Sequence, residues 1–505
     1  MSISQKNTYR ILLITGFIVL NSLLLLGIGE IYSFLNSGAS KASIFHGDLE
    51  GEIDYHPEIS WDSLNCEGGP LSIRIVRDVI DDYKVAWFVR NNALFSGDEQ
   101  GIDDMFTQSA REKIRKLIAH NKEQGISVET TTLAHHLQFD LVSADGKLVA
   151  FTDREVRSHS RLWEQENRLG DKEEIASYRV VMLLEDGFWR IRHMRKFDVR
   201  QPQPPSFKPL PMPDRIEGIN YYPQQTPWNT FGEGFDPEVI GHDLDKLRAL
   251  KMNTVRIFVS YNDFGGAQVH SEKLQKLERF LDLAVERELR VVVTLFDFYG
   301  DYSVRDWSST RRHARLVVEH LRDHPALWSW DIKNEPDLDF DHRGKEVVIL
   351  WLEQMARHVK AIDPTHGVTV GWSSGDAALS LEEPLDYVSF HFYEDLGLLQ
   401  ETVDSLRGRT TKPIVLQEFG LSSDFGLWNL FGKKQRNQAE YYEKFLKINQ
   451  GLDLHYLPWT LYDFEEVPSS VGGISPWVKN KQSHFGLIDR EGNEKESFQV
   501  MRQRD

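Results

Sequence analysis

The chain has 505 residues, which is more than one ordinary domain requires and predicts two or three domains. Its 59 basic and 77 acidic residues give a formal net charge of −18, which argues against nucleic acid or an anionic lipid surface as the main partner. Because Cys66 is the only cysteine, the sequence excludes an intramolecular disulfide, thiol redox chemistry and cysteine-based metal sites.

The sequence begins with a long uncharged segment. Residues 11–29 carry no charged side chain, and the basic residues Lys6 and Arg10 precede them. A run of this length crosses a bilayer as a helix, and the basic residues place the N-terminus in the cytoplasm. We therefore expect residues 1–43 to form a cytoplasmic tip, a single-pass membrane anchor and a juxtamembrane segment, with the remaining chain periplasmic or extracellular. The alternative is a cleaved signal peptide, with Ser40-Lys41-Ala42 as the processing site.

Residues 44–200 have the pattern of an α+β domain in which a curved sheet wraps a helix. Helices are predicted first and strands follow, with hairpin turns at Asp145-Gly146 and Asp186-Gly187. The predicted helices are residues 78–95 and 102–124, and the predicted strands are residues 127–142, 147–157, 175–184 and 188–197.

The order of these elements and the closing segment at residues 185–191, Glu-Asp-Gly-Phe-Trp-Arg-Ile, resemble the nuclear-transport-factor-2-like (NTF2-like) cone fold. Some members of that superfamily are enzymes, and many only bind or scaffold. We interpret residues 44–200 as an accessory domain that could contact envelope polysaccharide machinery.

Residues 201–213 contain six prolines and predict an extended linker that marks a domain boundary. After it, residues 214–505 alternate strand and helix signals, which fits an α/β fold of the (β/α)8 barrel type. A doubly wound sheet would also alternate, but Tyr-Tyr-Pro-Gln at residues 221–224 replaces the glycine-rich turn of a dinucleotide site. The predicted strands are residues 216–222, 254–259, 290–296, 327–334, 367–371, 387–391, 413–418 and 454–461.

Two of these strands end in a glutamate, Glu335 and Glu418, separated by about three βα units of ~30 residues each. Side chains at the carboxyl ends of barrel strands line the active site, so the two glutamates should face each other across the barrel mouth. Two opposed carboxylates can break a glycosidic bond, since one protonates the leaving oxygen and the other attacks or activates water.

The residues around these glutamates resemble the retaining clan of barrel glycosidases, with the cellulases and mannanases of glycoside hydrolase family 5 as the nearest match. The resemblance implies that Glu335 is the acid/base and Glu418 the nucleophile of a membrane-anchored glycosidase that cleaves β-linked polysaccharide. Four motifs carry it: Asn334-Glu335-Pro336, His391-Phe392-Tyr393, Gln417-Glu418-Phe419-Gly420 and Pro458-Trp459.

Arg256 alternates with apolar neighbours on its strand and therefore points into the barrel, where an arginine needs a carboxylate partner. The resemblance supplies Glu418 as that partner; the alternative is a salt bridge to a helix. One departure concerns the end of the third strand, where many relatives carry histidine and this chain has Phe-Asp-Phe-Tyr at residues 296–299.

Further roles are implied by the resemblance. Asn334 is expected to bind the sugar 2-hydroxyl, and Trp459 to form the stacking floor for the sugar next to the cleaved bond. His391 and Tyr393 are two residues apart and share one strand face, and the resemblance implies that they hold Glu335 and Glu418, respectively.

We expect no metal and no nucleotide cofactor. A catalytically silent glycan-binding or scaffold protein is the alternative function, although binding alone requires no paired glutamates. We also expect endo action on a β-glucan, a mannan or an exopolysaccharide, with transfer to a sugar acceptor in place of water as a variant. Exposed Trp372 and Trp428 would then provide additional stacking subsites.

Overall fold

The computed structural model describes residues 53–203, 207–212, 215–424, 433–473 and 475–504. Asp54–Asp505 form one compact unit. The predicted membrane anchor at residues 11–29 lies outside the described residues, and within the described ranges no helix has both the length and the apolar character needed to cross a membrane.

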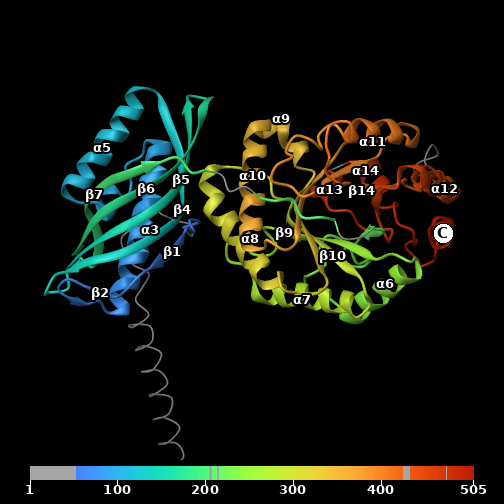
Figure 1. Cartoon of the computed structure of the whole chain (residues 1–505), viewed down its shortest axis with the longest axis horizontal. Coiled ribbons are helices and arrows are strands. Elements are labelled where there is room, and N and C mark those ends of the chain that lie inside the picture. Colours follow the sequence, from blue (N-terminus) through green and yellow to red (C-terminus); the bar gives the residue numbers. More distant parts are fainter. Residues whose placement is uncertain (1–52, 204–206, 213–214, 425–432, 474, 505) are drawn as a thin grey trace, which may run out of the picture. The chain divides into compact units, whose positions relative to one another are not determined.

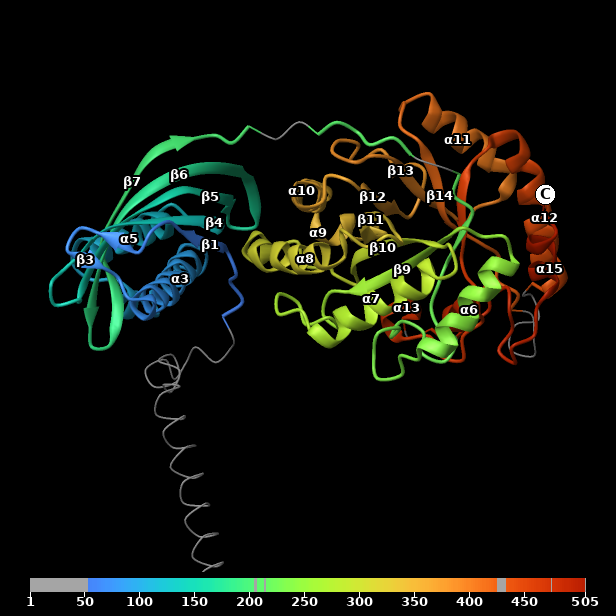
Figure 2. The same cartoon turned by 60° about the horizontal axis from the view of Figure 1, so that its bottom comes forward.

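The first part of the described chain is a five-stranded sheet in the order β1-β4-β5-β6-β7. Strand β1 runs parallel to β4, and the other pairs are antiparallel. Figures 1 and 2 show this curved sheet with helices α3 and α5 beside it. The strands are β1 (Glu58–Trp61), β4 (Ile126–Val142), β5 (Leu148–Glu164), β6 (Asn167–Glu185) and β7 (Phe188–Arg200), and a small ribbon is formed by β2 (Asn65–Cys66) and β3 (Gly69–Pro70).

Helix α3 (Ile73–Ser96) packs its apolar side, including Tyr83 and Trp87, against the sheet. It begins where the Ser72 hydroxyl accepts a hydrogen bond from the Ile75 N–H, and it ends at Gly97, whose φ of 74° suits glycine. The predicted helix at 102–124 is instead two helices, α4 (Ile102–Met105) and α5 (Gln108–Glu123).

The expected mixture of a sheet with helices is confirmed, whereas the likeness to the NTF2-like cone stays a prediction. Strand β1 was missed by the sequence reading, and β5 and β6 are longer than predicted. In β6 the acidic Glu173 near the unpredicted end is held by Arg157 of β5 at 2.6 Å. A cross-strand partner therefore allows a strongly charged segment to continue as a strand.

The second part is an eight-stranded parallel barrel in the order β8 to β15, as predicted. Bridges from Asn220 to Trp459 and from Glu217 to Tyr456 join its first and last strands. The strands are β8 (Gly218–Asn220), β9 (Thr254–Ser260), β10 (Arg290–Asp297), β11 (Leu327–Asn334), β12 (Gly367–Trp372), β13 (Val388–Phe392), β14 (Ile414–Phe419) and β15 (His455–Pro458).

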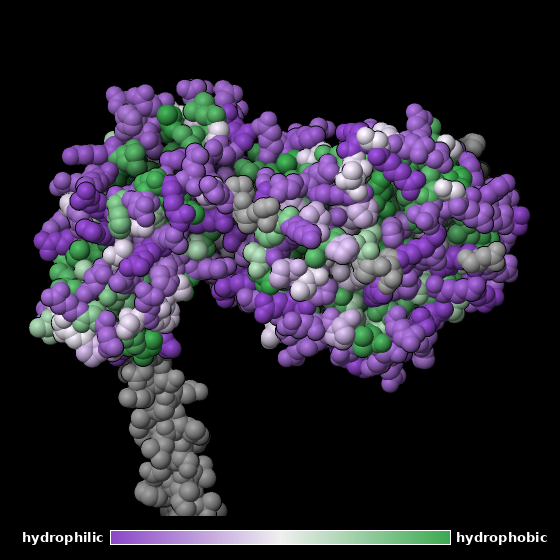
Figure 3. Space-filling model, in the orientation of Figure 1, coloured by the Kyte–Doolittle hydropathy of each residue, from purple (hydrophilic) through white to green (hydrophobic). Residues whose placement is uncertain are grey.

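Helices cover the outside of the barrel strands (Figure 2). The longer ones are α6 (Pro237–Ala249), α7 (Ser271–Val285), α8 (Trp307–Leu321), α10 (Lys345–Ile362), α11 (Leu399–Arg407) and α12 (Gln435–Leu452). The shorter ones are η1 (Val304–Asp306), η2 (Pro336–Asp339), α9 (Phe340–Arg343), η3 (Leu396–Leu398), α13 (Ser469–Gly472), α14 (Pro476–Gln482) and α15 (Glu496–Arg502). The face drawn in Figure 3 is mainly hydrophilic, with apolar residues scattered over it, as expected where a surface meets water.

The described residues of the proline-rich linker contact the barrel. The Leu210 N–H donates to Asp386 Oδ1 at 2.8 Å, and Met212 packs on an apolar cluster that includes Ile216 and Trp328. This part of the linker is therefore attached to the barrel and does not act as a free spacer.

The sheet also contacts the loop that follows β10. Glu129 on β4 is buried, and its Oε1 accepts hydrogen bonds from the Ser303 hydroxyl at 2.6 Å and the Val304 N–H at 2.7 Å. Its Oε2 accepts one from Trp163 Nε1 at 3.1 Å and lies 3.9 Å from buried Arg161. One carboxylate thus satisfies donors from both the sheet and the start of η1.

We expect Glu129→Ala to lower the free energy of unfolding by about 3 kcal/mol, because it leaves the Ser303 hydroxyl, the Val304 N–H and Trp163 Nε1 without their acceptor. Urea denaturation of the full-length protein measures the change. Glu112→Ala, at an exposed position of α5, is the control and should stay within ~0.5 kcal/mol of the parent. Equal stability of the two variants would contradict the role assigned to Glu129.

Candidate active site

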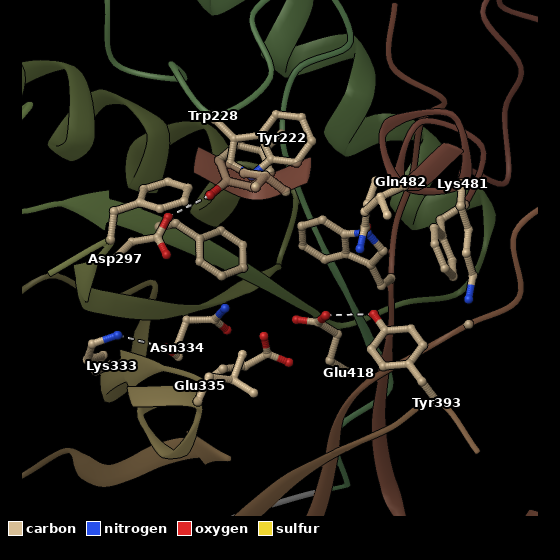
Figure 4. Close-up of a pocket in the computed structure, with 18 of the residues that line it drawn as sticks. Tyr222, Trp228, Asp297, Lys333, Asn334, Glu335, Tyr393, Glu418, Lys481 and Gln482 are labelled. Atoms are coloured by element: carbon tan, nitrogen blue, oxygen red, sulfur yellow. Dashed lines mark hydrogen bonds between the residues drawn. The ribbon is translucent and has the colours of Figure 1, made fainter. Parts of the chain in front are cut away.

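A cavity of about 710 Å³ opens at the carboxyl ends of the barrel strands. Asn334, Glu335, Tyr393, Glu418 and Trp459, all singled out from the sequence, line it. Figure 4 shows Glu335 and Glu418 on opposite sides of this space with their carboxylates directed towards each other.

Glu335 follows directly after β11, where the chain leaves the sheet. Its φ of 45° lies in the left-handed region, which is uncommon for a residue with a side chain and which turns the chain into η2 at Pro336. The Glu335 N–H still donates to Gly371 O of β12 at 2.7 Å, so the turn is anchored to the neighbouring strand. Strain of this kind is typical of functional sites.

Glu418 lies near the end of β14 and is 7% exposed. Its Oε1 accepts a hydrogen bond from the Tyr393 hydroxyl at 2.6 Å, and its Oε2 lies 3.3 Å from Arg256 Nη1. Both contacts favour the ionised carboxylate.

Arg256 is fully buried inside the barrel. Its closest carboxylate is Asp331, whose Oδ2 lies 2.6 Å from Nη2, and the sequence analysis did not identify this residue. The same nitrogen donates to Asn334 Oδ1 at 2.7 Å, and Nη1 donates to Asn220 Oδ1 at 2.9 Å. The guanidinium therefore holds the ends of several strands together and fixes the side chain of Asn334.

His391 on β13 lies between the two glutamates. Its Nδ1 is 2.8 Å from Glu335 Oε1 and 3.7 Å from Glu418 Oε2. Burial disfavours the charged imidazolium, but Glu418 and Glu335 together outweigh burial and raise the pKa of His391. One ligand atom from each of the three side chains falls within 4.8 Å of the others.

The two carboxyl groups have different surroundings. Burial raises the pKa of Glu418, and its charge repulsion with Glu335 acts in the same direction. For Glu335, burial is outweighed by the hydrogen bond from His391, which lowers its pKa. Two carboxylates this close do not ionise independently, so the two carboxyl groups and His391 titrate as a coupled set.

The same three side chains have the spacing that a metal ion would need. Arg256 and Tyr393, however, already supply positive charge and a hydrogen bond to Glu418. The donor set is therefore complete as an acid–base site without a metal ion, and the expectation that the protein uses no metal stays a prediction.

Trp459 follows β15 and is 7% exposed at the cavity wall. Tyr222 packs edge-on against it with ring centres 6.1 Å apart, and Tyr222 also stacks on Phe258 at 4.9 Å. These contacts hold the tryptophan as a fixed apolar surface at the cavity.

The expectation that Trp372 is an exposed stacking residue is wrong, because this side chain is fully buried. Its neighbour Gly371 faces the barrel interior, where its N–H donates to Asp331 Oδ1, so Trp372 points outward into the helix layer and packs near Phe340. Trp428 lies outside the described residues.

Sequence reasoning also missed Lys333 and the contact made by Asp297. Lys333 is nearly buried, lines the cavity, and donates to Asn334 O at 3.1 Å. Asp297 occupies the end of β10, where the sequence had shown only a departure from the expected histidine. The absence of the expected histidine was the sequence signal that could have drawn attention to Asp297.

Residues 223–465 match the family model of cellulases, glycosyl hydrolase family 5. The relatives include a beta-glucuronidase of Chlorocebus aethiops, 26% identical over 273 residues that cover 50% of this chain and 39% of the relative. They also include a putative mannan endo-1,4-beta-mannosidase 4 of Arabidopsis thaliana, 24% identical over 211 residues that cover 33% of this chain and 48% of the relative. This chain thus spans less than half the length of either protein.

Among solved structures, an exo-beta-1,4-mannosidase from Opitutaceae bacterium strain TAV5 aligns with 21% identity and a TM-score of 0.48, covering 57% of this chain and 58% of that one. Taken with the eight-stranded topology, the family match over residues 223–465 identifies the barrel as a glycosyl hydrolase family 5 (β/α)8 barrel.

We expect Glu335→Gln to lower the pKa of His391, because it removes a negative charge 2.8 Å from the ring. Titration of ¹⁵N-labelled histidines by NMR measures this shift, with His391→Asn used to assign the signal. An unchanged pKa would mean that Glu335 does not raise the pKa of the ring.

Proposed function

We propose that the barrel is a retaining β-glycosidase that hydrolyses a β-linked polysaccharide by double displacement. The observation that carries this proposal is the short distance between the two carboxyl groups, with ligand atoms of Glu335 and Glu418 within 4.8 Å. Retaining enzymes hold their carboxyl groups about 5–5.5 Å apart, whereas inverting enzymes need ~6.5–9.5 Å to admit a water molecule between them.

In the first step Glu418 attacks the anomeric carbon while Glu335 protonates the leaving glycosidic oxygen. Arg256 and Tyr393 favour the ionised Glu418 that this attack needs. In the second step Glu335 removes a proton from water, which displaces Glu418 from the sugar and restores the original anomeric configuration.

The surroundings of Glu335 bear on its roles in the two steps. His391 lowers the pKa of Glu335, which suits the base of the second step. A sugar bound between the carboxyl groups removes water from Glu335, and burial of this kind raises a carboxyl pKa and favours the protonated acid of the first step.

The substrate we propose is a β-glucan, a mannan or a related exopolysaccharide, cleaved within the chain. Support comes from the family 5 match and from relatives that include mannan endo-1,4-beta-mannosidases. Trp459 provides an apolar surface for the ring next to the cleaved bond, and Asn334, held by Arg256, is placed to bind its 2-hydroxyl.

Glu418→Gln is expected to abolish turnover, because it removes the nucleophile. Glu335→Ala is expected to lower kcat/KM on polymers by about 10²–10⁴-fold, because it removes the acid/base. The loss should be smaller on aryl glycosides, whose good leaving groups need no protonation. Azide should restore turnover by forming a β-glycosyl azide, because it attacks without the help of a base. Product analysis on a panel of β-glucans, mannans and bacterial exopolysaccharides measures both variants beside the parent, with exposed Glu401→Gln as the control.

Each other result on this panel contradicts a specific part of the proposal. A product of inverted configuration would reject double displacement, and release of monosaccharides alone would reject endo action. Polymer binding without turnover by the parent protein would favour the silent glycan-binding alternative.

We also propose that the protein is tethered to a cell membrane with the barrel outside the cytoplasm. The uncharged run at residues 11–29 behind Lys6 and Arg10 supports this topology. A reporter fused after Asp505 should be active only on the extracytoplasmic side, and the protein should sediment with membranes. Soluble protein that begins near Ser43 would instead indicate a cleaved signal peptide.

A further inference from the structure

Asp297 is a nearly buried carboxylate at the wall of the proposed active site. It ends β10, lines the cavity and is 6% exposed. The Tyr222 hydroxyl donates a hydrogen bond to its Oδ2 at 2.9 Å. Figure 4 shows this bond on one side of the carboxylate, while the second oxygen points away from Tyr222 towards the part of the cavity where Asn334 lies.

The carboxylate is only partly satisfied by the protein. Tyr222 and the backbone N–H of Phe298 donate to it, but a carboxylate can accept about four hydrogen bonds. Within the described part of the chain no lysine, arginine or histidine forms an ion pair with it. The nearby Lys333 lies 3.6 Å from Asp339 and donates to Asn334 O.

An incompletely paired buried charge destabilises a fold unless a ligand completes its hydrogen bonds. Burial raises the pKa of Asp297 to about 6. The Tyr222 hydrogen bond and the charges of Lys333 and Arg256 act in the opposite direction, so the group is mostly ionised at pH 7.5. The site therefore has a negative charge at the cavity wall with free acceptor capacity.

The position of Asp297 indicates which part of the substrate it meets. Its partner Tyr222 packs against Trp459, the proposed floor for the sugar next to the cleaved bond, and stacks on Phe258. A ring seated on Trp459 would present hydroxyl groups towards Asp297 on one side and Asn334 on the other. The cavity wall is also acidic, with carboxyl groups of Asp297, Glu335, Asp339 and Glu418 against the amines of Lys333 and Lys481.

We propose that Asp297 determines substrate specificity by accepting hydrogen bonds from the hydroxyls of an uncharged sugar and by repelling a ring that carries a carboxylate. The substrate class is therefore a neutral β-linked glycan and not a polyuronate. This inference rests on the proposed function for the seating of the sugar. Like charges brought together in a dry site strongly disfavour binding, whereas hydroxyl donors complete the carboxylate's hydrogen bonds.

The test compares matched oligosaccharides in the full-length Glu418→Gln protein, which binds without turnover. The neutral probes are β-1,4-mannotriose and cellotriose, and the acidic probe is β-1,4-trimannuronate, which differs from mannotriose only in its carboxylates. Calorimetry at pH 7.5 should give at least tenfold tighter binding of a neutral trimer than of trimannuronate. Adding Asp297→Asn should reduce that preference at least threefold, and Asp297→Glu should retain more of it.

The pH dependence gives a second readout. In the Glu418→Gln protein the preference for the neutral trimer should decline as the pH falls through about 6, where Asp297 takes up a proton. The double variant with Asp297→Asn should lack this change. A merely structural aspartate would not produce a pH-dependent preference that Asn removes.

Stability provides a check that the variant folds. Because the folded pKa of Asp297 is raised above its ordinary value of 3.8, the native state is favoured at pH 4 and loses that advantage as the pH rises through about 6. Asp297→Asn should therefore raise the Tm at pH 7.5 relative to the parent, an effect that should disappear at pH 4.

The outcomes separate this inference from the proposed function. Equal binding of trimannuronate and the neutral trimers, or an unchanged preference in Asp297→Asn, overturns the role of Asp297 even if the parent hydrolyses β-glycans. A preference that depends on Asp297 in a parent protein without turnover supports the inference and rejects hydrolysis. Failure of all three trimers to bind also overturns it.

Discussion

The buried guanidinium of Arg256 is the constraint on which the site depends. A fully desolvated arginine is tolerated only when anions and hydrogen-bond acceptors surround it. Here Asp331 and Asn334 on β11 and Glu418 on β14 surround it from across the barrel. Gly371 belongs to this arrangement, because a Cβ there would lie 2.9 Å from Arg256 Nη2. The side chains in this part of the barrel interior are therefore arranged around the positive charge of Arg256.

The positive charge of Arg256 is balanced by the carboxylates of Asp331 and Glu418. Arg256 and Tyr393 stabilise the anion of Glu418, while the hydrogen bond from His391 lowers the pKa of Glu335. The carboxyl groups differ in surroundings although they lie close together, which is how one pair of identical side chains can serve two chemical roles. The additional carboxylate of Asp297 extends the negative wall towards the region where a sugar would bind.

The sheet of the first part and the barrel share a structural contact near the site. Glu129 holds Ser303 and Val304, which follow the loop that begins at Asp297 and contributes to the cavity wall. Loops at the carboxyl face of a barrel need support from packed elements to keep catalytic side chains in place. The five-stranded sheet therefore contacts and supports a loop of the candidate site.

The sequence by itself determined the features that depend on local pattern. Apolar runs that end in Asn-Glu-Pro or Gln-Glu-Phe-Gly placed Glu335 and Glu418 at strand ends, and the alternation of strand and helix predicted the barrel. The alternation of side chains along a strand also predicted that Arg256 points into the barrel. These features need only neighbouring residues, so they are readable without a structure.

Tertiary structure alone decided which distant side chains meet. Asp331 on β11 contacts Arg256 on β9, with β10 lying between the two strands. Tyr222 donates a hydrogen bond to Asp297, which lies 75 positions later in the chain. Trp372 was expected to be exposed, but its strand turns it into the helix layer. Burial and cross-strand contacts depend on how the whole barrel closes. A local stretch of sequence does not specify that closure.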